Sequence, residues 1–195
     1  VPSVLYTLQH LSMKYFNRKA MVIGPGIKTG LNIRIDNQTQ LGSDIVANSV
    51  AALEMYRSPI VIVDVGTATT FTVIDEKSVL QGVIIAQGLK MSLDALSAGA
   101  SELPDVSITP PKRIIAKNSQ EAMNVGVLYG HGFMIDGFID KICENLSLDK
   151  VNTIITGGLA EVVMPFCKHK PLLVPNLTFL GLKALYLKNK TQKVL

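Results

Sequence analysis

One short stretch between two apolar runs carries the clearest chemistry of this sequence. Residues 61–71 read Val-Ile-Val-Asp-Val-Gly-Thr-Ala-Thr-Thr-Phe. Gly66 in a turn between two strands lets the backbone approach a ligand closely, and backbone N–H groups with the hydroxyls of Thr67, Thr69 and Thr70 form a concavity for anions. Asp64 would end a buried strand, where a carboxylate is costly unless it meets a cation or hydrogen-bond donors. The pattern fits a polyphosphate with a cation, but also a polar hairpin of strand-forming threonines.

Two other motifs could extend such a site. Asp44 stands near the start of an expected helix, where the helix dipole favours its ionised form, so it could accept a proton from a hydroxyl nucleophile. Equally, Ser43 or Asp44 could simply cap that helix. Gly157-Gly158 follows an expected strand and leaves room for a flat ligand such as adenine, although a plain strand-to-helix turn has the same pattern.

Mixed helical and strand patterns must position these residues. Three closely spaced β-rich runs predict an antiparallel meander over 60–65, 69–75 and 79–86. Apolar periodicity predicts helices over 3–16, 42–57, 89–103, 119–145, 159–169 and 179–190. Shorter strands are expected in 20–24, 31–37, 151–156 and 171–175. This order indicates an α/β protein without regular βαβ alternation.

Composition excludes several classes of function. The 195 residues carry a net charge of only +4, the lysines are scattered, and aromatic residues make up 6% with no Trp, so we expect no nucleic-acid binding. No apolar run is long enough to span a bilayer, so we expect no membrane association. Cys143 and Cys167 have no C-x-x-C spacing and are expected to be reduced core thiols of a cytoplasmic protein. Three separated histidines form no metal-ligand motif.

Read together, the motifs resemble those of the type III pantothenate kinases, a family of the actin-like ATPase and sugar-kinase superfamily. "DVGTATTFTVID" is similar to the second phosphate loop of that family, "LGSDIVAN" to its Gly-Ala-Asp-Arg-x-Ala-Asn motif, and "ITGGLA" to its adenosine motif. "GPGIKTGLNIRIDN", "ALSAGASELPDV" and "NSQEAMNVG" resemble three further segments of the family in the same order. The resemblance extends from the first residues to about residue 185.

The resemblance implies an α/β actin-like (ribonuclease-H-like) fold with two similar halves, the first of them incomplete in this chain. Residues 1–58 would be the remainder of the N-terminal half, and 59–195 the C-terminal half. The implied activity is ATP-dependent phosphorylation of the primary hydroxyl of pantothenate, the first step of coenzyme A synthesis. It also implies Mg²⁺ with the ATP, a monovalent cation (K⁺ or NH₄⁺) and a homodimer.

The same resemblance assigns roles to individual residues. Asp44 would be the general base and Asp64 would bind the monovalent cation. The pantothenate-binding residues would be Gly42, Ser43, Asp44, Ile45 and Ser119. The ATP-binding residues would be Gly66, Thr67, Thr69, Gly157 and Gly158.

Some positions depart from the family pattern. Ile45 replaces an arginine, Ile35 a common tyrosine, and Gln38 and Gln87 usual prolines. The sequence also contains no Asp-x-Gly-Asn-Thr segment, the first phosphate loop of the family, so we expect a first block of strands to be missing and half of the nucleotide clamp with it. These departures leave open a non-catalytic paralogue with a regulatory or accessory role, or a kinase for another small hydroxyl substrate.

Overall fold

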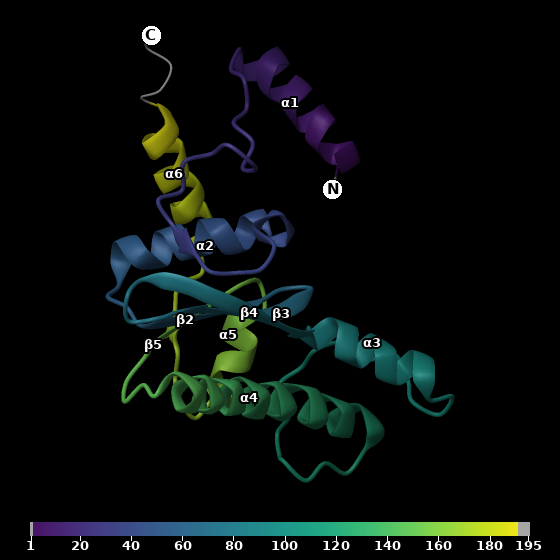
Figure 1. Ribbon diagram of the computed structural model, residues 1–195. Helices are drawn as coiled ribbons and strands as arrows, with labels where there is room; N and C mark the ends of the chain where they lie inside the picture. The colour runs from purple at the N-terminus through teal and green to yellow at the C-terminus, as the bar shows by residue number, and fades with distance from the viewer. Residues whose placement is uncertain (1, 191–195) are drawn as a thin grey trace.

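A six-stranded mixed sheet forms the centre of the computed structural model, which describes residues 2–190 (Figure 1). The strand order is β1-β4-β3-β2-β5-β6. The strands are β1 (Asn32–Ile33), β2 (Ile60–Val65), β3 (Ala68–Ile74), β4 (Val79–Gln87), β5 (Asn152–Thr156) and β6 (Leu172–Leu173). β2, β3 and β4 form the predicted antiparallel meander, and β5 and β6 continue the sheet parallel to β2.

The path of the chain after the meander identifies the fold. From β4 the chain passes through α3 (Leu89–Gly99) and α4 (Ser119–Leu146) and returns beside β2 as β5. It then crosses through α5 (Ala160–Val163) and the 3₁₀ turn η2 (Met164–Phe166) to β6. Three antiparallel strands followed by two parallel strands on the other side of the first are the arrangement of a ribonuclease-H-like unit. The predicted α/β, actin-like fold is therefore confirmed.

Helices cover both faces of the sheet. α2 (Ser43–Met55) and α6 (Leu177–Lys190) lie on one face, while α3, α4 and α5 lie on the other (Figure 1). The side chains of β2 alternate accordingly: Ile60 and Ile62 join the cluster under α2, and the three valines of the strand join the cluster under α4. A strand buried on both faces is an almost unbroken apolar run, which makes Asp64 near its end conspicuous.

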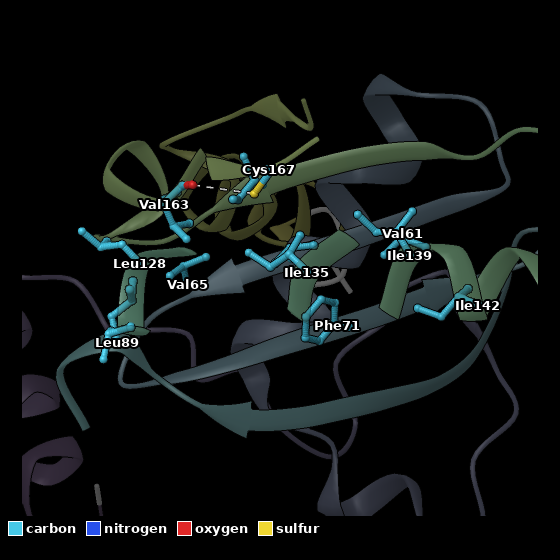
Figure 2. Packing of buried hydrophobic residues seen from close by; sticks show 14 of the residues in the cluster. Val61, Val65, Phe71, Leu89, Leu128, Ile135, Ile139, Ile142, Val163 and Cys167 are labelled. Atoms are coloured by element: carbon cyan, nitrogen blue, oxygen red, sulfur yellow. Dashed lines mark hydrogen bonds between the residues drawn. The ribbon is translucent and has the colours of Figure 1, made fainter. Parts of the chain in front are cut away.

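The cluster under α4 is the larger part of the core. Figure 2 shows Ile135 and Ile139 of α4 over Phe71 of β3, all three fully or almost fully buried. Cys167 lies in the same cluster, and burial raises the pKa of its thiol to about 12. Cys143 is partly buried, and both cysteines are free, as the sequence predicts.

Several predicted elements are wrong or shorter than expected. Residues 20–24 form no strand, and 31–37 pair only over the two residues of β1. Positive-φ glycines at 26 and 30 separate the two stretches, and the 3₁₀ turn η1 (Gln38–Gln40) follows β1. α3 ends at Gly99 instead of near residue 103. The helix expected over 159–169 stops at Val163, and the chain continues as a 3₁₀ turn that contains a proline.

Two long helices illustrate what periodicity does and does not predict. α4 runs unbroken through its glycines, as expected; a Cβ on Gly132 would overlap the Phe166 carbonyl, so glycine lets α4 lie directly on η2. α1 (Pro2–Phe16) also forms, but Leu8 and Tyr15 of its apolar stripe are 55% and 67% exposed, and the helix stands apart from the sheet (Figure 1). Within residues 2–190, no helix is both long and apolar enough to cross a bilayer.

Candidate active site

Asp64 stands at the edge of the sheet where β2 and β5 end and β3 begins. It is paired in register with Thr70 of β3 on one side and with Thr156 of β5 on the other. Its side chain is partly buried on the α2 face, where Asn48 Nδ2 donates a hydrogen bond of 2.9 Å to Asp64 Oδ2. Asp64, predicted to need a cation or hydrogen-bond donors, therefore has a donor on the neighbouring helix α2.

Asn48 is held in place by a second hydrogen bond. The hydroxyl of Thr178 on α6 donates to Asn48 Oδ1 at 2.8 Å, which turns the amide nitrogen toward Asp64. The reasoning from sequence missed both residues. Asn48 follows Asp44 by four positions, so both lie on one face of α2, and this spacing is the signal that could have revealed it.

Asp44 lies in the exposed first turn of α2, close enough to Asp64 for its charge to act on that carboxyl. Burial raises the pKa of Asp64, the hydrogen bond from Asn48 lowers it, and the negative charge of Asp44 raises it further. The alternative that Ser43 or Asp44 caps the helix is wrong: Gly42 is the N-cap and no side chain makes a capping bond. A Cβ on Gly42 would overlap the Asp44 carboxylate, so glycine leaves space for that side chain.

The turn between β2 and β3 brings a second predicted segment to the same place. The Gly66 N–H donates to the Ala68 carbonyl at 3.1 Å, and Thr67 is exposed at the tip. A Cβ on Gly66 would lie 3.6 Å from the Ala68 oxygen, an ordinary contact, so the fold leaves room for a side chain there. Thr69 is fully buried and its hydroxyl has no partner among the described residues, which argues against the predicted contact of this side chain with ATP.

Gly157 joins the third predicted segment to this cluster. Its φ is +100°, and a Cβ would lie 2.6 Å from Asp64 Oδ1 and 2.5 Å from the Val65 carbonyl oxygen. The Leu159 N–H also donates to Val65 O at 3.2 Å. Gly158 is exposed with no atom near its Cβ position. The Gly157–Gly158 turn, which was predicted to leave room for adenine, is therefore packed directly against the end of β2.

Ser119 does not join this group. It is the exposed first helical residue of α4, and its neighbours Asn118 and Gln120 line a cleft of about 510 Å³ with the 105–113 loop. Neither Ser119 itself nor any other predicted site residue lines that cleft. α4 covers the face of the sheet opposite to α2, so Ser119 and Asp44 belong to different layers.

The charges of the cluster suit a bound cation. In the described part of the chain, neither Asp44 nor Asp64 forms an ion pair, and no three His, Cys, Asp or Glu side chains gather into a metal site. Two neighbouring carboxylates without a cationic side chain, one of them partly buried, leave negative charge unbalanced. Carboxylate and carbonyl oxygens are ligands for hard cations, so the donor set fits K⁺ or Mg²⁺.

Comparison with known proteins decides the family. The family described as Type III pantothenate kinase matches residues 1–141 of this chain. The chain belongs to the type III pantothenate kinase family. A type III pantothenate kinase of Geobacillus sp. (strain WCH70) is 41% identical over 193 residues, which cover 99% of this chain and 74% of that protein. One from Listeria monocytogenes serotype 4a (strain HCC23) is 40% identical over 97% of this chain and 73% of its own length.

A solved structure is similar to this chain in fold. A structure from Campylobacter jejuni described as a Baf family transcriptional activator superposes with a TM-score of 0.59 at 22% identity, over 94% of this chain and 80% of its own. At that identity the likeness concerns the fold alone.

The structure also places three residues that the sequence analysis singled out as departures, Ile45, Ile35 and Gln38. The side chain of Ile45 is only 9% exposed and belongs to the buried residues of the fold, so its predicted contact with substrate has little surface to use. Ile35 lies partly buried beyond β1, and Gln38 is exposed and donates to the Ile33 carbonyl.

Proposed function

We propose that this protein transfers the γ-phosphate of ATP to the primary hydroxyl of pantothenate, the reaction its family name denotes. The observation that supports this most is the meeting of Asp44, Asp64, Gly66 and Gly157 at one end of β2 from segments far apart in the sequence. Phosphoryl transfer demands positioning and charge neutralisation rather than covalent chemistry by the protein. A cluster of carboxylates and glycines, without a nucleophile, is suited to that demand.

We assign proton transfer to Asp44. It is exposed in the first turn of α2, while Asp64 is partly buried and engaged by Asn48. An exposed carboxylate can meet an incoming hydroxyl within hydrogen-bond distance and accept its proton as the phosphoryl group arrives. Gly42 and Ser43 lie beside it and would contact pantothenate through the backbone and a hydroxyl.

We assign the nucleotide to the two glycine turns. Phosphates would approach the backbone at Gly66 and the hydroxyl of Thr67, and the adenosine part would lie against Gly157 and Gly158. The fold does not by itself exclude a side chain at position 66, so close approach of a ligand is a better reason for glycine there than internal packing. At position 157 the fold requires glycine, so that residue supports the site by shaping it.

We assign a monovalent cation, K⁺ or NH₄⁺, to Asp64, and Mg²⁺ to the bound ATP. When bound, these ions neutralise phosphate charge during transfer. Asp64 would bind its cation through the carboxylate, with Asn48 orienting that group. A cation there would oppose the effects of burial and of Asp44 on the pKa of Asp64.

A homodimer completes the proposal. Ser119 lies in the layer opposite to Asp44, so a second copy offers a way for a Ser119 to reach pantothenate held at Asp44.

We divide the chain into an N-terminal segment, 1–58, that supplies α1, β1 and α2, and a C-terminal half, 59–195, that holds the meander and the parallel strands. The free cysteines fit the reducing cytoplasm.

The decisive experiment is pantothenate-dependent ADP release with ATP, Mg²⁺ and K⁺ in excess, alongside Asp44→Asn as a matched control. We expect turnover by the wild type and a large loss in the variant. Turnover only with other hydroxyl compounds would favour the second candidate, a kinase for a different small alcohol. The isoleucines at positions 45 and 35 are the observation that favours this candidate. A folded protein that turns over none of them would contradict both.

A further inference from the structure

His131 of α4 is buried between two backbone carbonyls. Its Nε2 lies 3.1 Å from the carbonyl oxygen of Gln87, the last residue of β4, and its Nδ1 lies 2.8 Å from that of Val127 in its own helix. The side chain is 5% exposed. Both carbonyls can only accept, and a neutral imidazole carries a single N–H, so it donates to one of them at a time. We assign that proton to Nε2, so that the ring donates to Gln87 and this bond joins two segments far apart in the sequence.

The residue after Gln87 presses against the glycine turn of the candidate site. Gly88 is the buried N-cap of α3, and a Cβ there would overlap the Thr67 carbonyl oxygen and lie 2.7 Å from that of Gly66. The backbone of Gly88 therefore forms one wall of the Gly66–Thr67 turn. A shift of the Gln87–Gly88 peptide would move that wall directly.

α4, which carries His131, is itself packed closely against its neighbours in the fold. Gly132, next to His131, lets α4 lie on the backbone of Phe166, because a Cβ there would overlap the Phe166 carbonyl. Leu128 of α4 shares a buried cluster with Val65 at the end of β2 and with Leu89, which follows Gly88 (Figure 2). One helix thus contacts the segments that flank both glycine turns.

We propose that His131 is a positioning residue for the nucleotide: through its hydrogen bond to Gln87 it fixes Gly88, and Gly88 fixes the Gly66–Thr67 turn. An apolar side chain would fill the same space without supplying this bond. His131 does not touch the turn itself, so its effect reaches the phosphates through the β4–α3 junction. The inference rests on the proposed function for its ligand, but its effect on the turn does not require a ligand.

Two variants separate the hydrogen bond from the packing. His131→Phe keeps a ring and removes both nitrogens, whereas His131→Gln retains a side-chain N–H. His10→Phe, at an exposed histidine of α1, is the matched control. Without nucleotide, we expect amide hydrogen exchange of residues 65–70 to accelerate in His131→Phe, to recover toward wild type in His131→Gln, and to stay unchanged in β5.

The second readout is the affinity for ADP with Mg²⁺, measured by calorimetry. We expect His131→Phe to weaken it by about tenfold, the cost of one buried hydrogen bond, with the KM for pantothenate unchanged and with partial recovery in His131→Gln. If His131→Phe does not fold, His131→Leu removes the same donor with less bulk.

The possible outcomes distinguish the two proposals. Wild-type exchange and affinity in a folded His131→Phe would overturn the positioning role. So would faster exchange spread evenly over the molecule, because that would indicate a purely structural histidine. A wild type that binds no ADP would contradict the proposed function and the nucleotide part of this inference, while the exchange of residues 65–70 would still decide whether His131 holds the turn.

Discussion

Asn48→Leu should destabilise the protein in a way that depends on the charge of Asp64. Asn48 donates to the Asp64 carboxylate at 2.9 Å and accepts from Thr178 at 2.8 Å, and it is only 2% exposed. Leucine has a similar volume, so the main loss is these two hydrogen bonds rather than packing. A hydrogen bond to a charged group contributes roughly 1.5–3 kcal/mol, and partial exposure of Asp64 places the loss at the lower end, about 1.5 kcal/mol.

The sign of the pH dependence follows from the effect of Asn48 on the pKa of Asp64. The hydrogen bond lowers that pKa, so it stabilises the ionised form. Its contribution is therefore present at neutral pH and is partly lost as pH falls through the acidic range in which Asp64 becomes protonated. The difference between wild type and Asn48→Leu should be larger at pH 7 than at pH 3.

Urea unfolding of both proteins at the two pH values measures this difference. For a chain of this size, about 1.5 kcal/mol corresponds to roughly 3–6 °C in Tm, which a thermal scan also resolves. Thr178→Val is the matched control, because it removes the outer hydrogen bond while Asn48 and Asp64 keep theirs; its smaller effect should not depend on pH. An equal loss at pH 7 and pH 3 in Asn48→Leu would refute the reasoning.

Three further predictions concern the candidate site. Asp44→Asn should lower turnover by roughly 10²–10⁴-fold while the affinity for ADP stays nearly unchanged, and unchanged turnover would remove Asp44 from the mechanism. If Asp64 binds a monovalent cation, activity or ATP affinity should depend on K⁺; equal behaviour in K⁺, Na⁺ and choline buffers would count against that assignment. Gly157→Ala should lower the free energy of unfolding by more than about 1 kcal/mol, because of its φ of +100° and the 2.6 Å approach to Asp64 Oδ1, whereas Gly158→Ala should be nearly neutral in the same urea titration.

The sequence predicted local structure best where a strong pattern met a buried environment. The meander and the long helix α4 were predicted correctly because alternation and helical periodicity persist over whole elements. The strand at 20–24 was wrong because its apolar residues have no neighbouring strand to pair with, and the following glycines turn the chain away. Strand propensity without a partner is a weak guide.

For the candidate site, too, the sequence predicted some residues correctly and others not. Asp44, Asp64 and Gly157 were recognised from motifs, and the structure brings them together. Thr69 was assigned a ligand contact although it lies two residues before Phe71, on the same face of β3; strand periodicity could have predicted its burial. The hydrogen bond of His131 to Gln87 had no local signal, because it depends on how α4 crosses the end of β4.

The strands that build the site are joined across very different lengths of chain. β2 and β3 meet through the short turn at Gly66, whereas β2 and β5 are separated by almost half the sequence. Closing the long loop costs more chain entropy, so contacts of this kind tend to form late in folding. A partly folded chain would contain the Gly66–Thr67 turn before Gly157 comes to lie beside Asp64. A ligand that needs both turns would recognise only the finished molecule, and its binding would stabilise that state over every intermediate.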